Sequence, residues 1–187
     1  LSRNGSEELK ARILPKVCSG EWVGAMAMSE PDIGTDVLGM STTADRQEDG
    51  SWLINGRKMW ITNGCIDDDG TPCDVVWTYA KTGVDQKGRA EISTFIVEKN
   101  HPGFSVGQKI LDKTGMRASN TAELVYDDCR VPADALVGNP GESIIHMMRN
   151  LELERLTLAA QSVGIAHRCV VEMNRYATER EAFGRQI

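Results

Sequence analysis

Two stretches decide the fold: Met28-Ser29-Glu30-Pro31-Asp32-Ile33-Gly34-Thr35-Asp36-Val37 and Lys58-Met59-Trp60-Ile61-Thr62-Asn63-Gly64. The first is a polar turn rich in backbone donors, which can wrap an anion or the polar edge of a ring. The second places an indole and a hydroxyl two residues apart on a β-like run. A flat, redox-active ring needs both features: a face to lie against and a hydrogen bond at its reactive edge.

Each stretch alone has an ordinary structural explanation. Pro31, Asp32 and Gly34 are common turn formers. Large residues such as Met59 and Trp60 are typical of a strand in a core. The presence of both stretches, in this order, is what favours a binding role.

The segment 22–136 has the composition of β structure around these stretches. Asp49-Gly50 and Asn55-Gly56 are two strong hairpin signals, and they predict a strand over 51–54 with a second strand over 57–62 folded back against it. Further β-rich runs occupy 75–80, 92–97, 105–110 and 122–131. Several short strands at this spacing predict a sandwich or barrel.

Helical patterns flank the β region. Residues 7–17 fit the tail of a helix that Pro15 ends. From Glu142 to Ala182 there is no proline, and the chain reaches Ile187 within the same pattern. One face repeats at helical spacing, which predicts a long helix broken at most once. The residues of that face are Ile144, Met148, Leu151, Leu158 and Ile165.

A mixed architecture follows from these patterns. We expect the end of an amino-terminal helical domain over 1–20, an all-β middle domain over 21–137, and the start of a carboxy-terminal helical bundle over 138–187. The first residue is not Met and the last helical pattern has no stop signal, so we expect an excerpt of a longer polypeptide.

Composition argues against several classes of protein. The net charge is -6, with 21 basic and 27 acidic residues and no basic cluster, which argues against a nucleic-acid partner. No apolar run approaches the roughly 20 residues of a membrane span. The five cysteines and three histidines lack the spacing of metal ligands, so no metal site is expected.

The helical stretch Leu151-Glu152-Leu153-Glu154-Arg155-Leu156 holds three charges in an otherwise apolar segment. Glu152 and Arg155 are spaced to neutralise each other as an i,i+3 pair. That pairing would leave Glu154 as an unpaired, partly desolvated carboxylate, as a general base requires. The pattern does not choose between Glu152 and Glu154, and a solvated acid on a helix face is the simpler alternative.

Taken together, these motifs resemble those of the acyl-CoA dehydrogenases, most of all the isovaleryl branch. The resemblance runs along the whole chain but spans less than half of a typical family member. The residues that carry it are Ala27–Pro31, Met59–Gly64, Tyr79–Thr82, Leu111–Arg117, Ser119–Thr121, Leu153–Leu156 and Arg180–Gly184.

The resemblance implies FAD as the cofactor. By match to the family motifs, Ser29 is expected to donate near the pyrimidine edge, Trp60 to pack against the isoalloxazine and the Thr62 hydroxyl to reach N5. Arg180 resembles the arginine that pairs with the FAD pyrophosphate across a subunit interface. The full expected set is Met26, Ala27, Met28, Ser29, Glu30, Gly34, Thr35, Trp60, Ile61, Thr62, Arg180 and Phe183.

By the same resemblance, Glu154 matches the catalytic base of the isovaleryl and long-chain branches. Substrate contacts are expected at Thr35, Glu152, Leu153 and Arg155. Two positions depart from isovaleryl-type enzymes. Ile145 stands where they have a Tyr nine residues before the base, and Glu152 stands where they have Asp. Both changes put the isovaleryl substrate in question and leave the flavin site intact.

The implied activity is dehydrogenation of a short branched acyl-CoA to the 2-enoyl-CoA, with electrons passed to an electron-transferring flavoprotein. The resemblance also implies a homotetramer that serves leucine catabolism, in the mitochondrial matrix of a eukaryote or the cytoplasm of a bacterium. The alternatives are a long-chain dehydrogenase or acyl-CoA oxidase of the same architecture, or a homologue that acts only as a binding module. The presence of Glu154 argues against the last.

Overall fold

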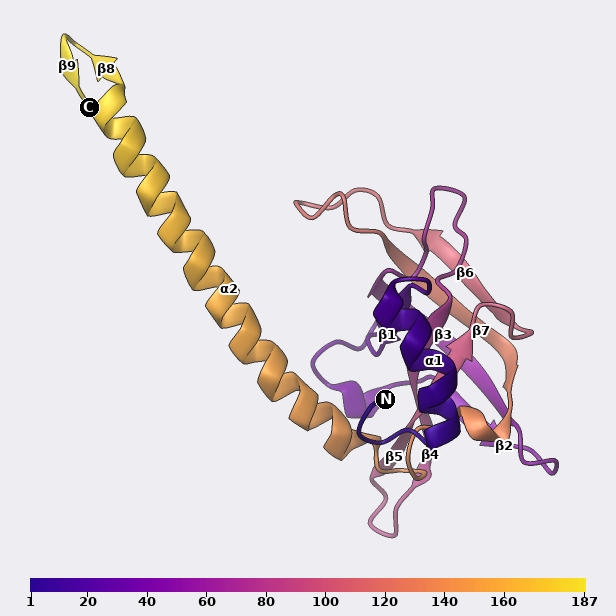
Figure 1. The fold of residues 1–187 in the computed structure, drawn as a ribbon. Helices are drawn as coiled ribbons and strands as arrows, with labels where there is room; N and C mark the ends of the chain where they lie inside the picture. The colour runs from indigo at the N-terminus through magenta and orange to yellow at the C-terminus, as the bar shows by residue number, and fades with distance from the viewer. The chain divides into compact units, whose positions relative to one another are not determined.

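The computed structural model describes all residues, Leu1–Ile187, as two compact units. The first unit, Leu1–Ile144, holds helix α1 and a β-sheet, and the second, Ile145–Ile187, is formed by most of helix α2 and a terminal hairpin (Figure 1). The predicted mixed class, an all-β domain followed by long helical structure, is confirmed.

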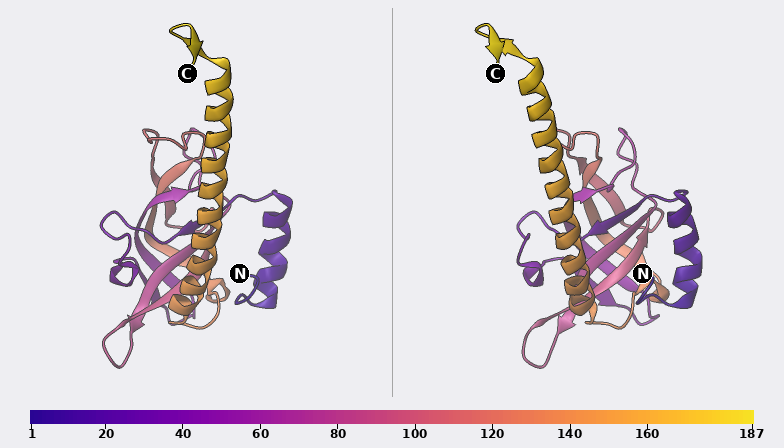
Figure 2. Two further views of the ribbon diagram at one scale, coloured as in Figure 1. Left: turned by 90° about the vertical axis from the view of Figure 1, so that its left-hand side faces the viewer. Right: turned by 60° about the vertical axis from the view of Figure 1, so that its left-hand side comes forward.

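Seven strands form one curled sheet in the first unit (Figure 2). Their order is β1-β4-β2-β3-β7-β6, and β5 pairs with β4. The four β-rich runs predicted after residue 74 correspond to β4, β5, β6 and β7. The strands are β1 Gly24–Ala27, β2 Thr43–Arg46, β3 Trp52–Thr62, β4 Val75–Val84, β5 Ala90–Glu98, β6 Phe104–Lys109 and β7 Thr121–Val131.

The larger core cluster is formed by alternate residues of the strands, which share one face of the sheet. The rings of Trp52 on β3 and Phe95 on β5 lie 5.1 Å apart between centroids. Leu124 and Tyr126 of β7 join the same cluster. Two short 3-10 turns, η1 (Val37–Gly39) and η2 (Ala133–Ala135), complete the unit.

Helix α1 (Glu7–Ser19) runs past the proline that was expected to end it. Pro15 removes one backbone donor, but Leu9 and Ile13 are buried against Val75 and Ile96, which keeps the helix on the sheet. The helix ends instead at Gly20, whose φ of 80° is the left-handed conformation that glycine adopts most easily. The predicted helix end at Pro15 is therefore wrong.

The first predicted hairpin is confirmed, because β2 and β3 pair antiparallel across Asp49-Gly50. The second is wrong, because Asn55-Gly56 lies inside the continuous strand β3. Gly56 has a φ of 147°, and a Cβ there would come within 2.5 Å of Thr42 Oγ1. Glycine therefore serves a close approach of two strands at this position rather than a turn.

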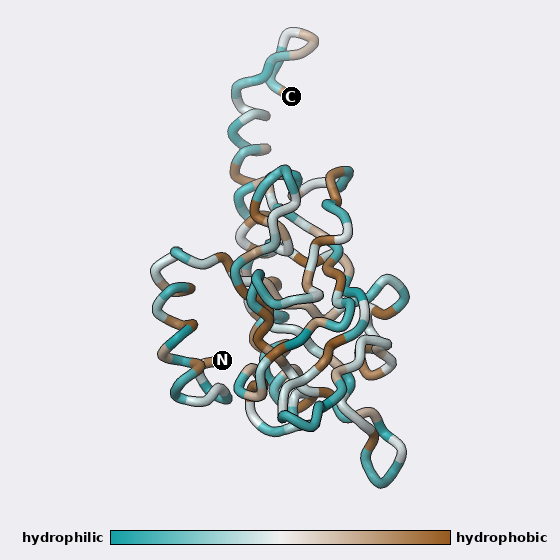
Figure 3. The backbone as a smooth tube through the Cα atoms, turned by 90° about the vertical axis from the view of Figure 1, so that its right-hand side faces the viewer, coloured by the Kyte–Doolittle hydropathy of each residue, from teal (hydrophilic) through white to brown (hydrophobic).

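Helix α2 (Ser143–Glu179) is continuous, without the break that the sequence allowed (Figure 2). Hydrophilic and hydrophobic residues alternate along it (Figure 3). The apolar stripe contains Met148, Leu158 and Ile165, and all three are exposed. Neither helix of the chain combines the length and apolar character that a membrane span requires.

The end of the chain is not helical, contrary to the prediction. Strands β8 (Glu181–Ala182) and β9 (Arg185–Gln186) form a small hairpin after α2. Phe183 and Gly184 between them have φ values of 54° and 74°. Two successive left-handed residues reverse the chain as in a type I′ turn. The spacing of apolar residues, on which the helical prediction rested, does not reveal such a turn.

Candidate functional site

The two motifs, Met28–Val37 and Lys58–Gly64, lie against each other in the first unit. Strand β1 leads into the polar turn, while β3 carries Lys58, Met59, Trp60 and Thr62. The Met59 backbone N–H donates to the Ser29 carbonyl at 2.9 Å. Within the turn, Glu30 and Ile33 exchange backbone hydrogen bonds of 2.8 and 3.2 Å. The fold therefore joins two segments that are far apart in sequence into one surface.

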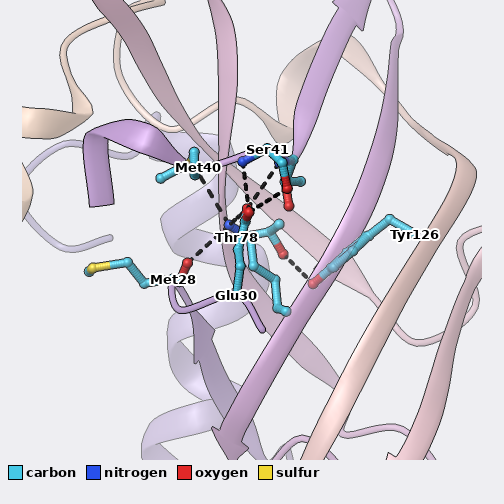
Figure 4. A network of polar contacts seen from close by, with 8 residues as sticks. Met28, Glu30, Met40, Ser41, Thr78 and Tyr126 are labelled. Atoms are coloured by element: carbon cyan, nitrogen blue, oxygen red, sulfur yellow. Dashed lines mark hydrogen bonds and ion pairs between the residues drawn. The ribbon is translucent and has the colours of Figure 1, made fainter. Parts of the chain in front are cut away.

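A buried ion pair holds this surface together. The Lys58 ammonium lies 3.0 Å from Glu30 Oε1 and donates to the Met28 carbonyl, also at 3.0 Å. Both charged side chains are essentially inaccessible to solvent. In Figure 4 the Met28 carbonyl, the Glu30 carboxylate and Ser41 belong to one network of dashed contacts, in which the Lys58 ammonium lies between Met28 and Glu30. The pair ties the polar turn to β3 through side chains as well as backbone.

The Glu30 carboxylate is stabilised in its charged form. It accepts hydrogen bonds from Ser41 N at 2.7 Å, Ser41 Oγ at 2.6 Å and Thr42 N at 3.0 Å. Burial raises the pKa of Glu30, but these donors and the Lys58 charge outweigh it and lower the pKa to about 2. Burial lowers the pKa of Lys58, and the neighbouring carboxylate opposes that shift.

Trp60 presents its indole to solvent from a strained backbone. Its φ is 59°, unusual for a bulky residue, and the β3–β7 pairing shifts register between Lys58 and Ile61. The side chain is 56% exposed although its neighbour Ile61 is buried. Such strain at an exposed aromatic residue favours a functional role for the ring.

Three hydroxyl groups of the two motifs have no partner in the chain. The side chains of Ser29, Thr35 and Thr62 make no hydrogen bond, and Thr35 and Thr62 are exposed. Met26 is also exposed, on strand β1 just before the motif. An exposed flat ring and unpaired hydroxyls in two adjoining motifs fit a planar ligand with a polar edge, which is the form of a flavin.

Three residues of the expected cofactor set bury their side chains. Ala27, Glu30 and Ile61 are at most 3% exposed, so only their backbone atoms are available to a ligand. The Glu30 side chain instead stabilises the surface from below, by its contacts with Lys58 and Ser41. Met28 and Ser29 are half-buried and Gly34 is exposed.

The expected base lies in the second unit. Glu154 is exposed on α2 and lines a shallow depression with Leu153, Thr157 and Leu158. The expectation of a partly desolvated carboxylate is wrong for this chain, because nearly every side chain from Met148 onward is exposed. The expected Glu152–Arg155 ion pair does not form either, since both side chains extend into solvent.

Arg180 and Phe183 lie where α2 gives way to the terminal hairpin. The Arg180 N–H donates to the Tyr176 carbonyl at 2.8 Å, and its own carbonyl accepts from Ile187 N at 3.1 Å. The guanidinium makes no ion pair, and the Phe183 ring is fully exposed. The structure thus brings Met26 to Thr35 together with Trp60 and Thr62 in one unit, while Glu154, Arg180 and Phe183 belong to the other.

Sequence reasoning gave no role to Lys58, Ser41 or Thr42. Lys58 was part of the quoted motif, yet its position follows Trp52 and Ile54 on the inward face of β3 at period 2. A lysine that faces the core is expected to pair with a buried carboxylate, so the period-2 pattern of β3 could have predicted that Lys58 has an acidic partner. That this partner is Glu30 could not be read from the sequence, because the fold brings the two residues together.

Comparison with known proteins agrees with this arrangement. The family model of the acyl-CoA dehydrogenase middle domain matches residues 25–129, and that of the acyl-CoA dehydrogenase carboxy-terminal domain matches residues 144–187.

Among curated relatives, the mitochondrial isovaleryl-CoA dehydrogenase of Solanum tuberosum is 47% identical over 187 residues, which are 100% of this chain and 43% of that protein. The mitochondrial 2-methylacyl-CoA dehydrogenase of the same plant is 46% identical, with the same coverage of 100% and 43%. The chain therefore spans less than half the length of these relatives.

Among solved structures, a glutaryl-CoA dehydrogenase from Mycobacterium smegmatis in complex with FADH2 superposes with a TM-score of 0.85 and 34% identity. The match covers 99% of this chain and 44% of that one. The middle-domain model alone matches more than half of the residues, at the positions that form the surface described above. The chain belongs to the acyl-CoA dehydrogenase family, whose members are FAD-dependent oxidoreductases.

Proposed function

We propose that the complete protein carrying this chain is an FAD-dependent dehydrogenase of short branched acyl-CoA thioesters. The observation that carries the proposal is the joined surface in which the Lys58–Glu30 pair holds the Ser29 turn beside Trp60 and Thr62. The identities of 46–47% to 2-methylacyl-CoA and isovaleryl-CoA dehydrogenases support the substrate class.

The residues of the first unit would bind and orient the cofactor. The exposed Trp60 indole offers a face for the ring, and the hydroxyls of Ser29 and Thr62 offer donors at its polar edge. Thr35 and Gly34 follow in the same turn and would lie toward the phosphates and the CoA chain. Arg180 would neutralise a pyrophosphate, with Phe183 beside it.

The Glu154 carboxylate would take the α-proton of the thioester. A substrate bound against α2 would displace water from the depression that Glu154 lines with Leu153 and Leu158. Loss of this water would favour proton transfer to the carboxylate. When bound, FAD supplies the acceptor for the hydride that leaves the β-carbon. Loss of one proton and one hydride leaves the 2-enoyl-CoA. Glu152, Leu153, Arg155 and Thr35 would contact the substrate.

The remaining partners are part of the same proposal. An electron-transferring flavoprotein would accept the electrons, and the protein would assemble as a homotetramer in which Arg180 serves a neighbouring subunit. The potato relatives named above are mitochondrial, so a mitochondrial matrix location is proposed for a eukaryotic source and a cytoplasmic one for a bacterial source.

A substrate panel tests the activity. The complete protein should turn over isovaleryl-CoA or 2-methylbutyryl-CoA faster than straight or long chains, with an artificial electron acceptor. Maximal turnover on chains of about twelve carbons or more would replace the proposal with a long-chain enzyme. Reoxidation of the reduced flavin by oxygen during turnover would indicate an oxidase, and no bleaching of flavin absorbance by any acyl-CoA would indicate a binding module.

A further inference from the structure

The Lys58 ammonium occupies the centre of the contact between the two motifs. Its side chain is fully buried, and its nearest oxygens are the Met28 carbonyl and Glu30 Oε1, each at 3.0 Å. Burying two charges costs several kcal/mol of desolvation, and well-packed apolar residues often replace such a pair without loss of stability. Stability alone therefore gives little reason for a lysine at this position.

The contact with the Met28 carbonyl acts on the next residue. That carbonyl and the Ser29 N–H belong to the same peptide group. A cation that binds the carbonyl oxygen polarises the peptide and strengthens its N–H as a donor. Neither the Ser29 N–H nor its hydroxyl has an acceptor in the chain, whereas the Ser29 carbonyl is held by the Met59 N–H at 2.9 Å. Ser29 is thus anchored through its acceptor and keeps its donors available.

The Glu30 carboxylate fixes the cation in this place. Its Oε2 accepts from the Ser41 N–H and hydroxyl, and its Oε1 accepts from both the Thr42 N–H and the Lys58 ammonium, so the carboxylate is held at both oxygens. The weak contact of Lys58 Nζ with Met40 Sδ at 3.8 Å closes the remaining side. The ammonium consequently has one geometry, and its positive charge is directed at the Met28–Ser29 peptide.

We propose that Lys58 is a positioning residue of the flavin site. It orients and polarises the Met28–Ser29 peptide so that the Ser29 N–H and hydroxyl serve as donors to the pyrimidine edge of the ring. This inference rests on the proposed function, because it requires that FAD binds this surface. A stronger donor stabilises the negative charge that the ring gains on reduction, so Lys58 should raise both the affinity for FAD and its reduction potential.

The test must separate this role from folding. Lys58→Met alone would leave the Glu30 charge buried and unpaired, which destabilises proteins by about 3–5 kcal/mol. The double variant Lys58→Met with Glu30→Gln replaces the pair with neutral side chains of similar size. A matched control is Lys99→Met with Asp74→Asn, which neutralises a second lysine–carboxylate pair, 2.7 Å apart, that contacts neither motif.

The experiment uses the complete protein, stripped of flavin and titrated with FAD by fluorescence. Reloaded samples then give the absorbance spectrum and the midpoint potential. We expect the Lys58/Glu30 double variant to stay folded by circular dichroism, to raise the Kd for FAD about tenfold or more, which corresponds to 1.4 kcal/mol, and to lower the midpoint potential. The Lys99/Asp74 control should match the wild type in its Kd for FAD and in its midpoint potential.

Each outcome decides the matter. An unchanged Kd and potential in the folded double variant would overturn the positioning role while the wild-type protein, by binding FAD, upholds the proposed function. Failure of the wild type to bind FAD would overturn both. If the double variant does not fold, Lys58→Gln with Glu30→Gln takes its place, because it also removes both charges and leaves an amide group at each position for hydrogen bonding within the buried network. In that variant the potential should fall, and an unchanged potential would refute the inference.

Discussion

At the scale of single residues, the surroundings of a carboxylate decide what it does. Glu30 is buried among donors and a cation, which lower its pKa to about 2 and keep it charged as a structural anchor. Glu154 lies exposed on α2 beside apolar side chains and has no hydrogen-bond partner in the chain. The same type of side chain is thus a fixed structural anchor in one unit and an exposed carboxylate without a partner in the other.

The assignment of the base gives a prediction for a pair of isosteric variants. Glu154→Gln in the complete protein should lower turnover by at least ~10²–10⁴-fold, the typical contribution of a general base, because no neighbouring carboxylate on α2 shares its depression. The flavin should remain bound, since Glu154 is not among the residues proposed to hold the cofactor. Steady-state kinetics and the flavin absorbance of the purified variant measure both quantities.

Glu152→Gln is the matched control, and it should cost far less activity. It changes the same side chain two residues earlier, on another side of the helix. A large loss in Glu152→Gln together with a small loss in Glu154→Gln would show that the base has been misassigned.

At the scale of elements, long-range packing extends two segments beyond the points where local signals would end them. Helix α1 continues through Pro15 because Leu9 and Ile13 are buried on the sheet. Strand β3 continues through Asn55-Gly56 because it pairs with β7 on both sides of the irregularity. The Asp128 N–H donates to Asn55 Oδ1 at 2.8 Å, so a residue typical of turns is used here to bind the neighbouring strand.

Gly56→Ala should destabilise the first unit. The new Cβ would meet Thr42 Oγ1 at 2.5 Å and Thr42 Cα at 2.7 Å, and the φ of 147° is strained for any residue with a side chain. Backbone strain and overpacking together predict a loss of about 2–4 kcal/mol in the free energy of unfolding. Urea unfolding of the complete apoprotein measures it.

Gly34→Ala provides the comparison, because no atom lies within 4 Å of the Cβ position. Its free energy of unfolding should stay within about 0.5 kcal/mol of the wild type. Equal effects of the two substitutions would contradict the close approach of β3 to Thr42.

At the scale of the whole molecule, the chain distributes the proposed site over two compact units. The first has a packed core of its own, and the second presents apolar side chains along α2 that are exposed in this chain. Exposed apolar surface of this kind marks an interaction site or promotes association. The activity proposed above therefore belongs to the complete protein and its assembly.

The 187-residue chain by itself should bind FAD weakly, show little dehydrogenase activity and self-associate. Ser29, Thr35, Trp60 and Thr62 would contact only part of the flavin, and Arg180 is expected to serve a neighbouring subunit. Calorimetric titration with FAD measures the affinity, and light scattering measures the association. Tight, stoichiometric binding would show that the first unit suffices for the cofactor.

Charged substitutions on the stripe separate the two effects. Leu158→Lys with Ile165→Lys should reduce self-association and leave FAD binding as it was, since both residues are exposed on α2. His167→Lys adds a charge to the same helix two residues after Ile165, on the side away from the stripe, and should leave the association unchanged. If both changes reduce self-association equally, net charge rather than apolar contact would be the cause of the reduction.

The sequence by itself determined the class of most elements and the family. Runs of β-favouring residues identified β4 to β7, helical spacing identified α2, and Asp49-Gly50 identified one hairpin, because each signal is carried by residues that are near neighbours in the chain. The order of the motifs at Met28–Val37 and Lys58–Gly64 was sufficient to point to acyl-CoA dehydrogenases. The roles of individual site residues remain predictions.

The tertiary structure alone decided the features that depend on residues far apart in sequence. The bond from Met59 to Ser29, the burial of Lys58 against Glu30 and the approach of Gly56 to Thr42 each join segments that no local pattern connects. The continuation of α1 through Pro15 has the same cause, since it depends on contacts with Val75 and Ile96. Local periodicity reports which face of an element is apolar, whereas the partner that covers this face is chosen only when the chain folds.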